Sequence, residues 1–103
     1  MTKILNKPTA PAVLRDAINR WIKRKYGKDH SKWYTMKAWR ERGEPYGDHA
    51  VGGVLIIEES PLYVCLNYGE DGWKADTELR TLCEKHGYYF QMLYAWALGF
   101  YKA

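Results

Sequence analysis

Residues 87–101 read GYYFQMLYAWALGFY, and this apolar stretch decides the fold that the sequence predicts. Almost none of its side chains favours water, so other elements must cover it on both sides. Its density of aromatic residues and the glycine at its start favour a single long β-strand. A helix is the alternative, because Met-Leu-Tyr-Ala-Trp-Ala-Leu has fair helix propensity.

Two shorter apolar runs before this stretch predict the rest of the sheet. Residues 54–58 (VLIIE) and 62–68 (LYVCLNY) flank a tight turn at 59–61 and predict an antiparallel hairpin. Neither run is long enough to cover the fifteen residues of 87–101. The far end of that strand, around 97–101, must therefore pair with another segment or be exposed for a partner.

The connection between 62–68 and 87–101 predicts a crossover. After a turn at 69–73, Asp76 is expected to cap a short helix that ends at Gly87. A strand, a helix and a further strand of this length form a right-handed unit. The two strands are then parallel to each other, either adjacent or one position apart.

The N-terminal part predicts an extended lead-in over residues 1–9, followed by an amphipathic helix. Thr9 can cap this helix, Pro11 suits its first turn, and Gly27 is expected to end it. Its apolar face is formed at helical spacing by Leu14, Ile18, Trp21 and Ile22.

Residues 31–42 (SKWYTMKAWRER) fit two interpretations. Their alternation fits a strand, whereas the spacing of their apolar residues fits a helix capped by Ser31. We favour a strand at the edge of the sheet, because its charged positions would protect that edge from unwanted pairing. Residues 43–53, with four glycines and a proline, predict a loop.

Together these segments predict one α+β domain over residues 1–103. The expected order is α-β-β-β-α-β, with a mixed sheet of three to four strands and two helices mainly on one face. The chain is long enough for a single hydrophobic core.

The composition is unusual in its aromatic residues, which comprise five Trp, nine Tyr and two Phe. Such residues can supply much of a small core, and Tyr and Trp are also enriched at binding surfaces. Cys65 and Cys83 form no CxxC pair and have no histidine at metal-ligand spacing, so we expect reduced, buried thiols in a cytoplasmic protein. No stretch is long and apolar enough to span a bilayer, so no membrane partner is expected.

The net charge of +4 hides a strong asymmetry between the two parts of the chain. Residues 1–42 hold twelve Lys and Arg against three Asp and Glu, whereas residues 43–103 hold four against nine. A chain divided in this way has a basic pole and an acidic side, unless the fold interleaves them.

The basic segment predicts one candidate binding site, for nucleic acid. Cations that contact phosphates and aromatic rings that stack on bases are the two components of single-strand or RNA binding. The alternative is a solvated basic face that only maintains solubility. The candidate residues are Arg20, Lys23, Arg24, Lys25, Lys28, Lys32, Trp33, Tyr34, Lys37, Trp39 and Arg40.

The surplus of aromatic residues and the bipolar charge favour a different function. The leading hypothesis is a non-enzymatic protein-interaction module, such as a small adaptor, regulator or inhibitor, with a second copy of the chain among its candidate partners. Its candidate interface residues lie near the end of the apolar stretch: Trp96, Phe100 and Tyr101.

The sequence carries no catalytic motif. It has no P-loop, no HExxH and no zinc-finger pattern, so neither a metal ion nor another cofactor is expected. Asp48 and His49, with Glu58, could assist a metal-dependent hydrolase or nuclease. This third hypothesis is the weakest, because polar loops commonly contain such residues.

Overall fold

Residues 87–101 do not form one strand but fold back on themselves as a β-hairpin. In the computed structural model, β3 spans Tyr88–Tyr94 and β4 spans Ala97–Lys102, with a turn at residues 95–96. The two strands pair antiparallel. As a single strand the stretch would extend about 50 Å, far beyond its short neighbours, so the hairpin supplies its own partner. The prediction of one long strand is wrong.

The structure describes four ranges of the chain, which are residues 7–27, 32–58, 60–67 and 72–103. The first six residues of the predicted lead-in lie outside the described residues, and residues 7–10 are irregular. The turns predicted at 59–61 and 69–73 also lie partly outside them.

Within the described residues, the sheet has four strands in the order β1-β2-β4-β3, and every pairing is antiparallel. β1 spans Lys32–Tyr34 and β2 spans Gly53–Ile56. The α+β class and the number of strands are confirmed. The mixed sheet and the parallel crossover are wrong, because both required strands at 62–68 and 87–101, and the first segment is helical while the second is a hairpin.

Four helices are described instead of the predicted two, and the observed order is α-β-α-β-α-α-β-β. They are α1 (Pro11–Tyr26), α2 (Met36–Glu41), α3 (Pro61–Asn67) and α4 (Gly72–Lys85). Asp76 does not cap α4, because this helix begins at Gly72. Asp76 lies inside the helix and forms an ion pair with Arg80 at 2.7 Å.

α1 agrees with its prediction along its length. Its apolar face is buried, and Gly27 follows its last residue and donates its N–H to the carbonyl of Lys23. Thr9 does not cap the helix, because Ala10 holds the N-cap position without a side-chain hydrogen bond. The N–H of Thr9 instead donates to the carbonyl of His86 at 3.0 Å, which ties the start of the chain to the end of α4.

α3 replaces the strand that was predicted at 62–68. The helix begins where Ser60 precedes Pro61, and the Ser60 Oγ accepts a hydrogen bond from the Leu62 N–H at 3.1 Å. A serine cap with proline at the first helical position is a helix start, and here it outweighs the β-branched and aromatic residues that follow. The predicted hairpin of 54–58 with 62–68 is therefore wrong.

The segment 31–42 contains both a strand, at Lys32–Tyr34, and a helix, at Met36–Glu41, so each of the two interpretations holds for one part of it. β1 is an edge strand that pairs with β2, as we favoured for this segment. Thr35 then caps α2, and its Oγ1 accepts from the Ala38 N–H at 3.1 Å. Ser31, the alternative cap, lies outside the described residues.

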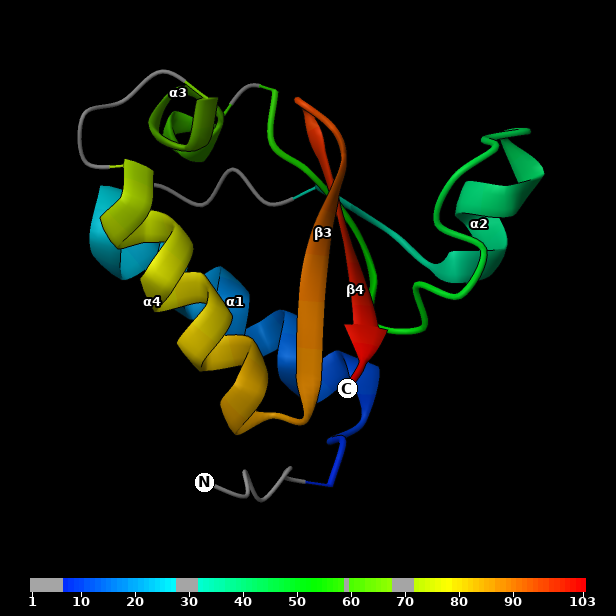
Figure 1. The fold of residues 1–103 in the computed structure, drawn as a ribbon, viewed down its shortest axis with the longest axis horizontal. Coiled ribbons are helices and arrows are strands. Elements are labelled where there is room, and N and C mark those ends of the chain that lie inside the picture. The colour runs from blue at the N-terminus through cyan, green and yellow to red at the C-terminus, as the bar shows by residue number, and fades with distance from the viewer. Residues whose placement is uncertain (1–6, 28–31, 59, 68–71) are drawn as a thin grey trace.

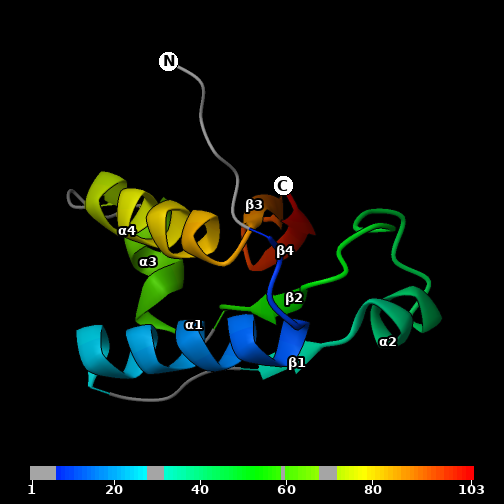
Figure 2. The same cartoon turned by 90° about the horizontal axis from the view of Figure 1, so that it is seen from below.

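α1, α3 and α4 pack on one face of the sheet, whereas α2 lies on the other side (Figures 1 and 2). The prediction of helices mainly on one face therefore agrees with three of the four. These three helices meet the sheet in the main core, which includes Leu14, Ile18, Leu55, Leu62, Leu79, Leu98 and Phe100.

The opposite face of the sheet carries a smaller second core around Trp39 of α2. Its other buried members are Ala50, Val54, Ile56 and Ala97. The indole of Trp39 has no exposed surface, and its Nε1–H donates to the carbonyl of Tyr46 at 2.7 Å. This core covers β2 and the start of β4, whereas Tyr89 and Gln91 of β3 stay exposed.

Gly47 lies against the second core and provides a test of its packing. Its φ is 88°, and a Cβ at this position would lie 2.9 Å from Leu93 Cδ1 and 3.0 Å from Trp39 Nε1. We expect Gly47→Ala to lower the free energy of unfolding by about 2–4 kcal/mol, from backbone strain and from crowding together. Urea unfolding followed by tryptophan fluorescence measures this loss.

Gly43→Ala is the matched control. Gly43 has a φ of 82°, but a Cβ there would meet nothing within 4 Å. It should lose only the backbone contribution, about 1–2 kcal/mol. Equal losses in the two variants would contradict the close packing of Leu93 and Trp39 on Gly47.

Candidate protein-interaction surface

Three of the seven cations of the predicted nucleic-acid site that the structure describes bind a carboxylate or a carbonyl of the same chain. Arg20 forms an ion pair with Asp16 at 2.6 Å, Lys25 pairs with Glu78 at 3.0 Å, and the Arg40 guanidinium donates to the Asp48 carbonyl. The remaining cations of the predicted site that the structure describes are exposed, and they are Lys23, Arg24, Lys32 and Lys37. Lys28 lies outside the described residues. Lys25 and Arg40 thus contact acidic residues from the second part of the chain.

The three aromatic residues of the predicted nucleic-acid site pack in or against the two hydrophobic cores. Trp39 is fully buried, so it has no surface on which a base could stack. Trp33 is half-buried, packs on the Phe100 ring and donates its Nε1–H to the Asn19 side chain at 2.7 Å. Tyr34 contacts the Trp39 ring, and the Arg42 guanidinium lies over both rings. The basic segment therefore lacks the freely exposed rings that the prediction required.

The predicted interface residues Trp96, Phe100 and Tyr101 lie in three different environments. Phe100 is completely buried in the main core, so its assignment to an interface is wrong. Trp96 is half-buried and stacks on Tyr94, with 4.8 Å between ring centroids. Tyr101 is half-buried on the open part of the sheet.

The open part of the sheet carries a group of neighbouring residues that we name the β3 surface. It consists of Tyr89 and Gln91 of β3 with Tyr101 of β4, which lie on the face away from the main core. Tyr89 is 42% exposed, which is high for a large side chain. Met92 is 44% exposed, but it lies at the edge of the opposite face, across from Leu98 of the main core. The rings of Tyr89 and Tyr101 stack with 5.4 Å between centroids and 19° between planes. Burial, followed by the neighbouring Tyr89 and Asp48, raises the pKa of Tyr101.

Sequence reasoning identified Tyr101 but missed Tyr89 and Gln91. The available signal was the alternation within β3, in which Tyr88 and Phe90 point to the main core and the residues between them point away. The alternation alone did not show which face would lack a cover, because that depends on the position of α2.

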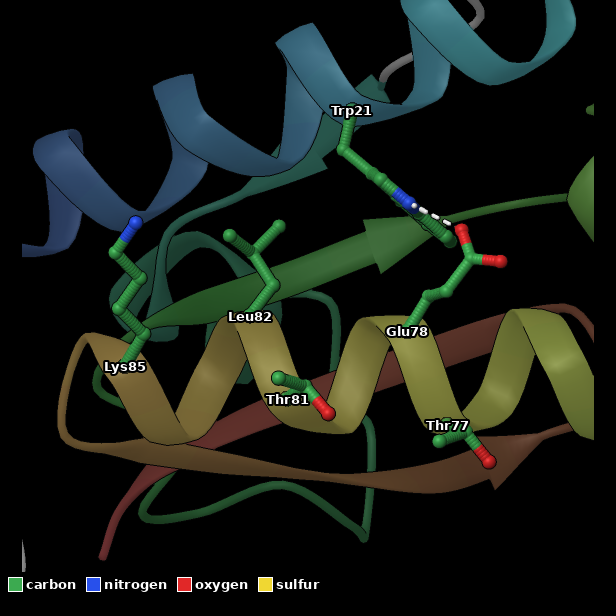
Figure 3. A pocket seen from close by; sticks show the side chains of 6 residues that line it. All are labelled: Trp21, Thr77, Glu78, Thr81, Leu82 and Lys85. Carbon is green, nitrogen blue, oxygen red and sulfur yellow. Dashed lines mark hydrogen bonds between the residues drawn. The ribbon is translucent and has the colours of Figure 1, made fainter.

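A groove of about 350 Å³ lies between α1 and α4 (Figure 3). Its walls are Trp21, Thr77, Glu78, Thr81, Leu82 and Lys85. Glu78 accepts hydrogen bonds from the Trp21 indole at 3.1 Å and from the Lys25 ammonium at 3.0 Å. These bonds, that of Lys25 first, hold the pKa of Glu78 below its usual value. An ionised carboxylate that already has two donors links the helices and does not act as a general acid at neutral pH.

The structure does not gather the residues of the third hypothesis into a site. Asp48 and His49 lie before β2 and Glu58 lies after it, and all three are exposed. The span of β2 alone separates them by about 13 Å. Among the described residues, no group of three or more His, Cys, Asp or Glu side chains could hold a metal ion. Within the same ranges, no helix is long and apolar enough to cross a membrane.

Cys83 is not placed to act as a nucleophile. Both thiols are free, with Cys65 half-buried on α3 and Cys83 fully buried on α4. Burial raises the pKa of Cys83 to about 12. A thiol in this environment remains protonated at physiological pH and is chemically inert.

Alkylation with iodoacetamide near pH 8 tests this environment. We expect Cys65 to react faster than Cys83 in the folded protein, because the buried thiol of Cys83 is neither ionised nor accessible. Mass spectrometry of proteolytic peptides measures each rate, and urea-unfolded protein is the control in which both should react. Equal rates in the folded protein would contradict the burial of Cys83.

The Glu78 carboxylate predicts a pH-dependent contribution to stability. Because its pKa is lowered by folding, this contribution is present above the ordinary value of 4.5 and is lost as pH falls through the lowered pKa. Glu78→Gln should therefore be less stable than the wild type at neutral pH, and the difference should vanish on acidification. Urea unfolding across the pH range measures it, with the exposed Glu58→Gln as the control. A difference that is independent of pH would contradict the role of the charge.

The chain was compared with protein-family models, with curated proteins and with solved structures, and none of them matches it. The functional argument therefore depends on the chemistry of its own residues.

Proposed function

We propose that the protein is a non-enzymatic protein-interaction module that binds its partner through the β3 surface. The observation that carries this proposal is the 42% exposure of Tyr89 and its stacking on Tyr101, on a strand without charged residues. Exposed aromatic side chains that lie together on a small domain mark an interaction site more often than a solvated surface. The two unpaired cysteines fit a reducing, cytoplasmic environment.

The geometry of Tyr89 and Tyr101 suits protein recognition. Tyrosine offers a large contact area at a low cost in conformational entropy, because it has only two side-chain torsions. Stacking of the two rings restricts them further before a partner arrives. The amide of the neighbouring Gln91 can donate and accept hydrogen bonds, which gives the apolar contact some directional specificity.

The surroundings of the β3 surface favour a protein partner over nucleic acid. Phosphate contacts require cations beside the aromatic rings, but no charged residue lies in β3. The aromatic residues of the basic segment, Trp33, Tyr34 and Trp39, pack in or against the cores instead. Apolar and aromatic contacts with a polar rim are typical of protein interfaces.

Affinity capture from an extract of the source cells tests the proposal with three baits. We expect the wild type to retain a specific partner. Tyr89→Lys should retain at least about tenfold less of this partner, because the variant places a charge in the apolar contact. Val64→Lys is the matched control, since Val64 is 56% exposed on α3 and does not belong to the β3 surface. It should retain the partner as the wild type does.

Circular dichroism and thermal melting must first show that all three baits are folded. If the three baits retain the same proteins in equal amounts, or if none retains any, the β3 surface is not the binding site and the proposal is wrong.

A further inference from the structure

The two edges of the sheet differ in how they are protected from pairing. β1 at one edge has three residues and begins with Lys32, and short charged edge strands resist pairing with other chains. β3 at the other edge has seven residues, YYFQMLY, without a charge or a proline. Its irregularity lies only at its end, between Met92 and Tyr94. Within the described residues, no strand pairs with the outer side of β3.

The backbone of β3 presents hydrogen-bonding groups to this open edge. The Ala103 N–H donates to the Gly87 carbonyl at 3.0 Å, so the polar groups of Gly87 point toward β4. These groups alternate along a strand, and those of Tyr88, Phe90 and Met92 therefore point away from β4. The outward direction of the even positions agrees with the His86 carbonyl, which accepts from Thr9 and not from β4.

We infer that a second copy of this chain pairs antiparallel with the outer edge of β3, so that two sheets join into one of eight strands. This inference rests on the proposed function and names a partner for the edge of the strand that carries the β3 surface. Antiparallel pairing of a strand with its own copy generates a two-fold axis, which is the commonest symmetry of protein dimers. Each strand then supplies the donors and acceptors that the other lacks.

The side chains of β3 are complementary to their own copies. With the two-fold axis beside Gln91, the two Gln91 side chains lie opposite each other, and Met92 of each copy lies opposite Phe90 of the other. Amide–amide hydrogen bonds and sulfur–aromatic contacts are both favourable in such cross-strand positions. Pairing also covers Met92, one of the two large apolar side chains of β3 that are exposed in the single chain.

The charge distribution allows this self-pairing even though each copy carries a net charge of +4. β3 itself is uncharged, so like charges do not face each other along the strand. Arg80 of α4 lies over the Phe90 ring, at 4.6 Å from its centroid. Its charge is compensated within the same helix by Asp76 at 2.7 Å. The cations Lys23, Arg24 and Lys37 belong to α1 and α2, not to the edge strand.

Static light scattering and hydrogen exchange test the inference on the full chain. From ~1 μM to ~1 mM, the apparent mass should rise from that of one chain to that of two. The amides of Phe90 and Met92 should exchange fast at low concentration and become protected as the dimer forms. The amides of Tyr89 and Gln91, which point to β4, should be protected at every concentration.

Substitutions locate the contact. Met92→Lys should raise the concentration for half-dimerisation by about tenfold or more, because it places a lysine on the edge strand of both copies. Gln91→Glu should act in the same direction by placing two carboxylates opposite each other, and it serves as the second variant if Met92→Lys does not fold. Val64→Lys on α3 is the matched control and should dimerise as the wild type does.

Three outcomes would overturn the inference. A dimer that resists both edge variants would show that the copies meet elsewhere. A monomer at every concentration with exposed Phe90 and Met92 amides would exclude self-pairing, and the three-bait capture would then decide separately whether another protein binds the β3 surface. A monomer in which these amides are protected would show that residues of the same chain cover the edge.

Discussion

The pairing of β3 with β4 is the interaction on which the rest of the structure depends. β4 lies between β2 and β3, and its residues from Ala97 to Phe100 are all buried. Leu98 and Phe100 belong to the main core, whereas Ala97 belongs to the second core on the opposite face. One strand therefore contributes to both cores. It reaches this central position only because the chain reverses at residues 95–96, so that β3 becomes the edge.

The size of α2 determines which part of the sheet remains available for binding. This helix has six residues and buries one large side chain, Trp39, against β2 and the start of β4. The backbone at Gly47 packs closely against that indole and covers the second core from the solvent side. Tyr101 packs against the margin of this core, whereas Tyr89 lies beyond it on the same face and stacks on Tyr101. A longer helix at this place would bury them and leave no aromatic surface for a partner.

The elements that the sequence predicts well are those whose signals are local. α1 has a complete apolar face and a glycine after its last turn, and both features act within a few residues. The turn at Ala95 and Trp96 contains no glycine, proline or asparagine, so the composition gives no sign that the strand ends there. The exposure of Tyr89 was not predictable for another reason, because it depends on how far a helix from a different part of the chain extends over the sheet.

The charge asymmetry of the sequence becomes a set of contacts between distant segments in the fold. Lys25 of α1 meets Glu78 of α4, and Arg40 of α2 meets the Asp48 carbonyl in the loop before β2. An exposed ion pair such as Lys25–Glu78 contributes only about 0–1 kcal/mol, so its main effect is to orient helices that the cores already hold. These two contacts use two of the cations that a nucleic-acid site would need. β3 carries no charge, and within the described residues no other strand pairs with its outer side, so this edge has no electrostatic protection. For this reason we propose the outer side of β3, and not the basic segment, as the place where another chain binds.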